Sequence, residues 1–310
     1  MAANVETMFS VREKPWHGLG TIVMEAPTSA DALRIAGLDW RVLQEPVYTE
    51  FSELIGGYRV NVRDSDRKVL GVVSDRYKVV QNADAFSFTD ELLGKGVRYE
   101  TAGSLQEGRK VWLLARLSSE YIIAGERISP YLVFSNSHDG SGSVKVAVTP
   151  VRVVCNNTLN LALSTAKRSF SMIHTGNIHD KIQEAKETLF MAERYMDSLG
   201  TEFEQLRQQK VTDAQVKEYI ELLLPMEKDA TPIQSKNIIR LRRDMEVRYY
   251  DAPDLQKVGN NAYRFINAVS DFATHSEPLR RTANYNENLF ARTMDGNPLI
   301  DKAYQLVKAA

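Results

Sequence analysis

The sequence predicts an α+β protein, in which a mostly antiparallel sheet with packed helices precedes a helical carboxy-terminal half that contains one long heptad-patterned helix. In the first half, short segments alternate apolar and polar residues, and turn residues separate them. These strands do not alternate one by one with helices, as the strands of a parallel sheet would. From residue 178 the apolar spacing becomes helical. We therefore expect two domains, an α+β sheet domain with an amino-terminal arm (1–173) and a helical domain (174–310).

The first predicted strands form a hairpin. Over 58–63 the alternation directs three apolar side chains to one face and three polar ones to the other: Tyr58, Val60 and Val62 against Arg59, Asn61 and Arg63. Residues 64–66 (Asp-Ser-Asp) are a turn signal, and 69–73 is the returning strand. A helix is predicted over 83–93, capped by Asn82 and stopped by Gly94.

Four more strands are expected at 97–101, 109–117, 131–136 and 144–149, the last two joined by a glycine-rich turn. The strand over 109–117 has two unlike faces: Val111, Leu113, Ala115 and Leu117 on one, and Lys110, Trp112, Leu114 and Arg116 on the other. The next segment, 150–170, is typical of a strand end that runs into a helix at an asparagine pair. It marks the passage from the sheet-rich half to the helical half.

The helical half opens on a predicted long helix. Its apolar residues are spaced alternately four and three apart, a heptad seam of about four repeats: Ile178, Ile182, Ala185, Leu189, Ala192, Met196, Leu199, Phe203 and Leu206. A strict heptad favours a long packed or coiled-coil helix, and its partner can be a later helix of the same chain or a second subunit. Capping signals predict helices after Thr212 and Thr231, and apolar patterns predict others at 260–273, 287–294 and 298–309.

The composition is that of an ordinary globular protein, with 43% hydrophobic and 25% charged residues. No apolar run approaches the roughly 18 residues that span a bilayer, so we expect no transmembrane helix. The amino terminus lacks the basic start and apolar core of a secretory signal, and the single cysteine, Cys155, fits a reducing cytoplasm. The net charge of −1 gives no global attraction to polyanions, so nucleic-acid binding would require a local basic surface.

No motif predicts a catalytic residue, a metal site or a cofactor site. The histidines lack the spacing that aligns two ligands on a helix, and no glycine-rich loop joins a strand to a helix as a phosphate site requires. Cys155 follows an apolar strand, which favours a buried thiol that behaves as a small hydrophobic residue. The alternative is a nucleophile acting with Asn156 and with His17 or His138, so the question of an enzymatic activity stays open.

Two basic surfaces are candidates for nucleic-acid binding. The polar face of the 109–117 strand carries cations around a tryptophan, the combination by which many single-strand binders hold backbone and bases. With the cations that could join it, this surface comprises Arg59, Arg63, Lys110, Trp112, Arg116, Lys145, Lys167 and Arg168. A secondary phosphate surface on the helix after Thr231 comprises Lys236, Arg240 and Arg243. Either surface can instead be a solvated face. In the amino-terminal arm, Trp16 and His17 can stack on a ring or can anchor the arm to the domain.

Three blocks of the sequence together resemble one family. They are Pro-Trp-His-Gly-Leu-Gly at 15–20, Val-Arg-Val-Val-Cys-Asn-Asn-Thr-Leu at 151–159, and Asn-Ala-Val-Ser-Asp-Phe at 267–272 with Asn-Leu-Phe at 288–290. With these blocks, in this order, the chain resembles the phage/plasmid-like protein family, a domain family of unknown function found on bacteriophages and mobile elements. The resemblance implies a phage or prophage origin and a place inside the bacterial host cell, and it implies no catalytic residue.

We therefore expect a phage-encoded protein that binds single-stranded nucleic acid as a homo-oligomer in the host cytoplasm, away from membranes. The fold pattern is similar to that of single-strand annealing recombination proteins, whose rings have a β-β-β-α core and a basic groove, and this similarity suggests an annealing or recombination role. The alternative is an interaction protein that inhibits a host defence component or sequesters a small nucleotide. The heptad helix, the balanced charge and the Trp16–His17 arm favour this alternative.

Overall fold

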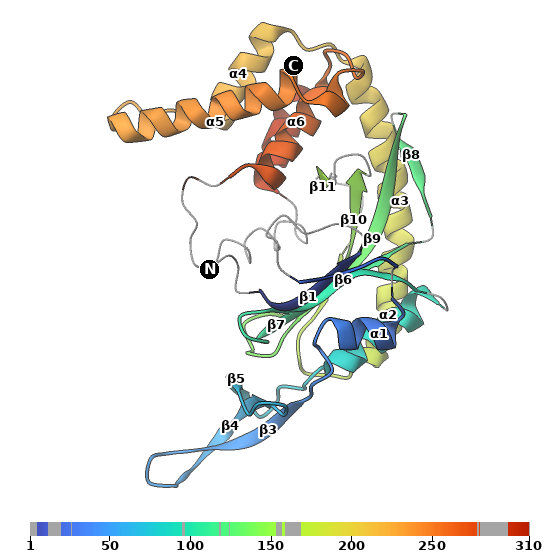
Figure 1. Cartoon of the computed structure of the whole chain (residues 1–310), viewed down its shortest axis with the longest axis vertical. Helices are drawn as coiled ribbons and strands as arrows, with labels where there is room; N and C mark the ends of the chain where they lie inside the picture. Colours follow the sequence, from blue (N-terminus) through green and yellow to red (C-terminus); the bar gives the residue numbers. More distant parts are fainter. Residues whose placement is uncertain are drawn as a thin grey trace. The chain divides into compact units, whose positions relative to one another are not determined.

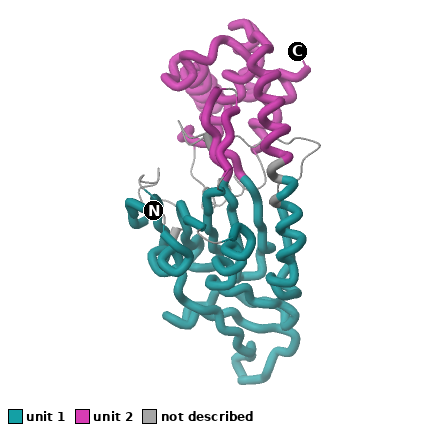
Figure 2. Tube along the Cα trace, turned by 90° about the vertical axis from the view of Figure 1, so that its right-hand side faces the viewer, with its two compact units in different colours: residues 1–118, 131–148, 167–192 teal, residues 119–130, 149–166, 193–310 magenta. Residues whose placement is uncertain are grey.

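The computed structural model describes residues 5–11, 20–25, 27–94, 97–117, 119–123, 125–152, 157–158, 169–277, 279 and 297–309. The chain forms two compact units whose segments interleave in the sequence (Figure 2). Unit 1 comprises residues 1–118, 131–148 and 167–192, and unit 2 comprises residues 119–130, 149–166 and 193–310. This division differs from the expected one at 173/174, because the first part of the long helix belongs to the sheet-rich unit.

The described strands form two sheets (Figure 1). The smaller is antiparallel, with the order β3 (Val42–Tyr48), β4 (Leu54–Arg63) and β5 (Val69–Ser74). The larger has nine strands: β1 (Val5–Val11), β2 (Thr21–Val23), β6 (Tyr99–Leu105), β7 (Lys110–Arg116), β8 (Tyr121–Ile123), β9 (Glu126–Ser137), β10 (Val144–Arg152), β11 (Asn157–Thr158) and β12 (Ser169–Met172).

The path through the larger sheet is β11-β10-β9-β7-β6-β1-β2, with β12 beside β10 and β8 beside β9. Six of its described pairings are antiparallel, and each involves β6, β7, β9 or β10, whereas β1 and β2 pair in parallel. The predicted class, α+β with a mostly antiparallel sheet, is therefore confirmed. The helix expected after residue 158 lies outside the described residues, but Asn157–Thr158 and Ser169–Met172 at its two ends are strands.

One face of the nine-stranded sheet carries the core of unit 1. Alternate residues of β7 and β9 are buried in it: Val111, Leu113, Ala115, Leu132 and Phe134. Helices α1 (Ser29–Ile35) and α2 (Asn82–Leu93) contact the strands of this sheet (Figure 1). The opposite face of the sheet is therefore the one that can carry polar side chains of unit 1.

The start of α2 differs from the prediction by one residue. Gln81 is the cap, and its side chain and that of Asp84 form a capping box. Asn82, the predicted cap, lies in the first turn and is buried, where its Nδ2 donates to the carbonyl oxygen of Leu38. Gly94 ends the helix with a φ of 85°, as a stop glycine does.

The long helix is present as α3 (Ile182–Gln208), preceded by a 3-10 turn, η1 (Ile178–Lys181). Its apolar residues are divided between the two cores. Ile178 and Ala185 lie in the core of unit 1, whereas the later residues Met196, Leu199, Phe203 and Leu206 lie in the core of unit 2. A single heptad seam is therefore not confirmed, because the two halves of the helix pack in different surroundings.

Unit 2 contains the other predicted helices: α4 (Asp213–Leu223), α5 (Pro232–Tyr250), α6 (Ala262–His275) and α8 (Pro298–Lys308), with a 3-10 turn η2 (Pro253–Leu255). The capping signal at Thr212 is confirmed as a capping box with Gln215. Thr231 is confirmed as the cap before Pro232, and it also forms a capping box with Gln234. All residues from Ala262 to Ser270 in α6 are buried, so this helix forms the centre of the unit. The helix expected at 287–294 lies outside the described residues. None of the described helices is both long and apolar enough to cross a membrane.

Candidate nucleic-acid interface

The candidate interface lies on the face of the nine-stranded sheet that is turned away from the core of unit 1. Along β7, residues that are buried in the core alternate with half-exposed ones, and the alternation predicted for this strand is confirmed. The half-exposed residues are Lys110, Trp112, Leu114 and Arg116. The strand therefore presents two cations and one indole ring on the same side of the sheet.

Neighbouring strands add to this side. Tyr131 of β9 is the register partner of Arg116, so its half-exposed ring lies on the same face. On β10, Lys145 stands between Val144 and Val146, which are both in the core, so its side chain points to the opposite face. We call these residues the cationic face: Lys110, Trp112, Arg116, Tyr131 and Lys145.

The indole of Trp112 is positioned by a glycine on the next strand. Gly103 of β6 is the register partner of Trp112, and a Cβ atom built at Gly103 would lie 2.7 Å from Cη2 of the indole. The ring therefore extends across β6 at a place where any side chain would exclude it. The strand predicted at 97–101 ends before Gly103, whereas Gly103 lies inside β6. The sequence signal for this close contact was a glycine within a strand, at the position opposite a tryptophan on the next strand.

Hydroxyl groups accompany the cations. Ser135 of β9 is the register partner of Trp112, and Ser171 of β12 is the partner of Lys145. From Lys110 to Arg116 the strand rises about 20 Å, at about 3.3 Å for each residue. Cations, hydroxyl groups and two aromatic rings thus lie on one side of the sheet, and these are the residue types that single-strand binders use. Tyr131 was not among the predicted site residues, although the alternation along its strand indicated which face of the sheet its side chain occupies.

Arg63 does not join the cationic face. It ends β4 in the smaller sheet, where its side chain is only 7% exposed. The guanidinium donates two hydrogen bonds to the carboxylate of Glu6 and two to that of Asp66, over 2.7–2.8 Å, and it lies 5.4 Å from the centre of the Trp40 ring. The hydrogen bond to Asp66 raises the pKa of Arg63, and the same bond lowers the pKa of Asp66 to about 2. With its charge balanced and buried, Arg63 has a structural role instead of the predicted phosphate contact.

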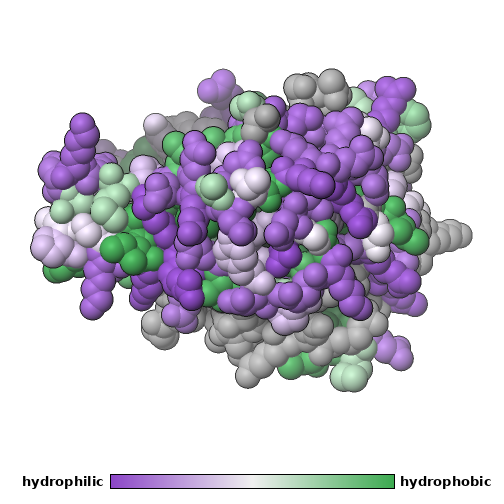
Figure 3. Space-filling model, turned by 90° about the horizontal axis from the view of Figure 1, so that it is seen from above, coloured by the Kyte–Doolittle hydropathy of each residue, from purple (hydrophilic) through white to green (hydrophobic). Residues whose placement is uncertain are grey.

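The other predicted cations are dispersed. Arg59 is exposed on β4 of the smaller sheet, away from the strands of the cationic face. Lys236, Arg240 and Arg243 are exposed on α5 in unit 2, and Arg243 lies 3.3 Å from a carboxylate oxygen of Glu246. The described residues seen in Figure 3 are mostly hydrophilic, as solvated surfaces are. Four predicted residues lie outside the described ones: Trp16, His17, Lys167 and Arg168.

A depression of about 470 Å³ lies beside Arg63 and Trp40. Its lining is predominantly acidic: Glu6, Asp39, Asp64 and Asp66, with Thr7, Gly37 and Ser65. Carboxylates repel phosphate groups, so this depression does not extend the candidate interface. Arg63, the cation that lines it, is surrounded by these carboxylates.

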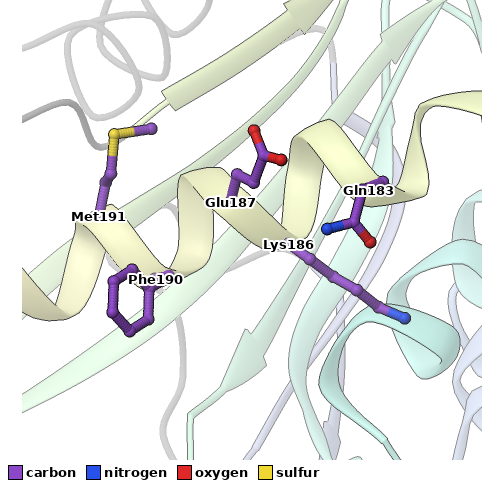
Figure 4. Close-up of a pocket in the computed structure, with 5 residues that line it drawn as sticks. All are labelled: Gln183, Lys186, Glu187, Phe190 and Met191. Carbon is purple, nitrogen blue, oxygen red and sulfur yellow. The ribbon is translucent and has the colours of Figure 1, made fainter.

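A second depression of about 470 Å³ lies along α3, and Figure 4 shows the residues that line it. Phe190 and Met191 form its apolar end, while Gln183, Lys186 and Glu187 form its polar end. Phe190 is 64% exposed. Its single lysine beside a glutamate makes this depression electrostatically neutral, so it offers nothing specific to a phosphate chain.

A buried polar cluster in unit 1 was not foreseen. The His138 side chain is fully buried, its Nε2 lies 3.0 Å from Oδ1 of Asn82, and its ring packs edge-on against Trp40. His174 is also buried, and its ring stacks on that of Tyr77 at 4.3 Å between centroids. His138, which follows β9, contacts Asn82 of α2 in this cluster. Tyr77, in the segment after β5, donates a hydrogen bond to the carbonyl oxygen of Ser137 at the end of β9. Among the described residues, no group of three or more His, Cys, Asp and Glu side chains could hold a metal ion.

Burial lowers the pKa of His138 to about 3, with a further lowering from His174, against a weak opposing effect of Asp139. Burial also lowers the pKa of His174. Above pH 6.5 both rings are neutral in the folded and unfolded chains. Below it the unfolded chain binds protons that the folded chain does not, so the free energy of unfolding falls with decreasing pH down to about pH 3. We expect His138 to contribute about 1 kcal/mol per pH unit to this fall.

Urea denaturation at pH 7.5 and pH 5 checks this expectation. The His138→Gln variant keeps a side-chain donor for Asn82, so it should lose less stability than the wild type on acidification. His179→Gln, at a half-exposed histidine beside Glu91, is the matched control. An equal loss in the wild type and in His138→Gln would contradict the assignment.

The protein is thus of the α+β class, and its larger sheet carries the aromatic and cationic side chains of the cationic face. The model of a family described as a domain of unknown function (DUF932) matches residues 69–294, and the chain belongs to that family. The matched region includes the whole cationic face. No curated protein and no solved structure matches the chain.

Proposed function

We propose that this protein binds single-stranded nucleic acid on the cationic face. The observation that supports the proposal is the placement of Trp112 and Tyr131 among three cations on one half-exposed sheet face. Cations neutralise phosphates, and aromatic rings stack on bases of any sequence, so a strand can bind without base-specific hydrogen bonds. We further propose that the protein is encoded by a phage or plasmid and acts in the host cytoplasm as an oligomer, in replication or recombination.

The proposed binding is weak at high salt. Three cations that each neutralise one phosphate give a slope of log K against log salt of about −2, since each contact on a single strand contributes about −0.7. This modest electrostatic part agrees with a net charge of −1. Base stacking then supplies much of the remaining affinity, at about 1–3 kcal/mol for each stacked base.

Fluorescence anisotropy with labelled single-stranded DNA and RNA, over a range of salt concentrations, tests the proposal. Trp112→Leu should weaken binding about tenfold through the loss of one stacked base. Lys110→Ala and Arg116→Ala should each weaken binding and reduce the steepness of the salt dependence by about 0.7. Oligonucleotide binding should also quench tryptophan fluorescence in the wild type more than in Trp112→Leu.

Arg59→Ala is the matched control, because this exposed arginine lies on the other sheet of the same unit. It should leave affinity and salt dependence unchanged. Lys236→Ala tests whether α5 supplies the secondary phosphate surface. An absence of any affinity at low salt would overturn the proposal, and so would binding that Trp112→Leu, Lys110→Ala and Arg116→Ala leave intact.

A further inference from the structure

Three buried side chains of unit 1 each carry a polar atom that has no hydrogen-bond partner among the described residues. These atoms are Oδ1 of Asn136, Nδ1 of His138 and Nε2 of His174, and the three residues are 3%, 0% and 5% exposed. A buried polar atom without a partner costs free energy comparable to a lost hydrogen bond, so folded proteins rarely leave one unsatisfied. The three atoms therefore indicate a bound ligand.

The hydrogen bonds around His138 show that its Nδ1 atom is an acceptor. The Nδ2 atom of Asn82 donates to the carbonyl oxygens of Leu38 and Trp40, over 3.0 and 3.4 Å, so Oδ1 of Asn82 is the atom that faces His138. Oδ1 only accepts, and its 3.0 Å contact with Nε2 of His138 therefore requires a proton on Nε2. A neutral imidazole has one N–H, so Nδ1 carries a lone pair.

The unpartnered atoms of His174 and Asn136 are acceptors as well. Nδ1 of His174 lies 3.1 Å from the carbonyl oxygen of Lys78, which only accepts, so the proton is on Nδ1 and Nε2 carries a lone pair. Nδ2 of Asn136 donates to the carbonyl oxygen of Val80 over 3.0 Å, which leaves Oδ1 as the unsatisfied acceptor. All three atoms thus need a donor, and none of them can donate to another.

The three acceptors belong to one region of the core of unit 1. His174, Asn136 and His138 form their hydrogen bonds with the first, third and fifth residues of a single segment, 78–82. Asn136 and His138 are two residues apart where β9 ends, and both are buried, so their side chains point to the same side. His174 also lowers the pKa of His138 through electrostatic repulsion, so the two rings are near each other.

We propose that unit 1 binds ordered water molecules in this region, and that they donate hydrogen bonds to Asn136, His138 and His174. One water molecule has two O–H donors, so three acceptors require at least two molecules. Buried waters in folded proteins bind polar groups that would otherwise lack a partner, and they are part of the structure. These waters would join the end of β9, the segment 78–82 and His174 without a direct hydrogen bond between the three side chains.

A cation is the alternative occupant, because it also binds lone pairs. Burial opposes the protonation of both histidines and lowers their pKa values, and the same loss of solvation opposes a metal ion or an ammonium group. The hydrogen-bond partners that the structure describes for the three side chains are two carbonyl groups and one amide. None of these partners is a carboxylate that would balance the charge of a cation, so the observations favour water.

A crystal structure of the full chain, at a resolution that shows ordered water, tests the proposal. It should place a water oxygen about 2.7–3.2 Å from each of the three acceptor atoms. His174→Phe keeps an aromatic ring that can stack on Tyr77 but has no lone pair, so its structure should lose the water bound at this position. His179→Gln, at a half-exposed histidine of the same unit, is the matched control and should keep every one of these waters.

Two measurements on the wild type do not depend on a variant that folds. The imidazole nitrogen resonances at pH 7.5 should identify neutral rings that are protonated on Nε2 of His138 and on Nδ1 of His174. An equimolar amount of zinc should leave the thermal midpoint unchanged, with or without a chelator. The absence of water at the three atoms, the opposite tautomers, or a midpoint that zinc raises and a chelator restores would each contradict the proposal. Asn136 lies on the core side of β9, as Phe134 does, so the outcome is independent of oligonucleotide binding on the cationic face.

Discussion

Replacement of Gly103 by valine is expected to unfold the protein or to lower its free energy of unfolding by more than about 3 kcal/mol, above the usual cost of overpacking. A Cβ atom at this position would lie 2.3 Å from the carbonyl oxygen of Thr7, 2.6 Å from Cβ of Met8 and 2.7 Å from Cη2 of Trp112. The first two atoms belong to the partner strand β1, which cannot move without breaking its ladder with β6. Urea denaturation and the yield of folded protein measure the loss.

Gly56→Val is the matched control, because a Cβ atom at Gly56 meets nothing within 4 Å. It should change the free energy of unfolding by no more than about 0.5 kcal/mol. If Gly103→Val were as stable as this control, the close approach of β1 and the indole over Gly103 would be wrong. Gly103→Ala adds a link to function: where the fold survives, it should displace the Trp112 ring and weaken oligonucleotide binding with it.

Arg63→Ala should lower the free energy of unfolding by about 3 kcal/mol, at the lower end of the range for breaking a buried ion pair because Asp66 and Glu6 keep some solvent. The substitution removes four hydrogen bonds and the contact with the Trp40 ring. It also leaves the Glu6 carboxylate, 27% exposed, without its cation. Thermal and urea denaturation at neutral pH measure the change.

Two variants show whether the geometry of Arg63 matters or only its charge. Arg63→Lys keeps the charge but cannot form two bidentate pairs, so its stability should lie between those of the wild type and Arg63→Ala. Arg59→Ala, two residues away and exposed, should be within about 0.5 kcal/mol of the wild type. A stable Arg63→Ala with reduced oligonucleotide affinity would reverse the assignment and return Arg63 to the nucleic-acid interface.

Local patterns predicted much of this fold. The alternation along β7 depends only on side-chain polarity and the two-residue period of a strand, and the structure has the same inner and outer residues. The helix starts at Thr212 and Thr231 depend on hydrogen bonds within four residues, and both capping boxes are present. A local pattern also places Lys145 on the same side of the sheet as Lys110. Its apolar neighbours on β10 point into the core, so the side chain of Lys145 points to the opposite face.

Contacts between residues far apart in the sequence determined the features of the fold and of the site that local patterns did not predict. The sequence alone determined which residues of β7 face the core, because that information lies in short-range periodicity. In β4 the tertiary structure overrode the same pattern, since the polar residues Asn61 and Arg63 are buried and the apolar Tyr58 is 54% exposed. The tertiary structure alone decided that Arg63 is held by Glu6, 57 residues away, and that Gly103 accommodates the ring of Trp112. It also decided that one continuous helix, α3, serves two cores. The structural role of Arg63 comes from the carboxylates that folding brings to it, and sequence spacing does not contain that distance.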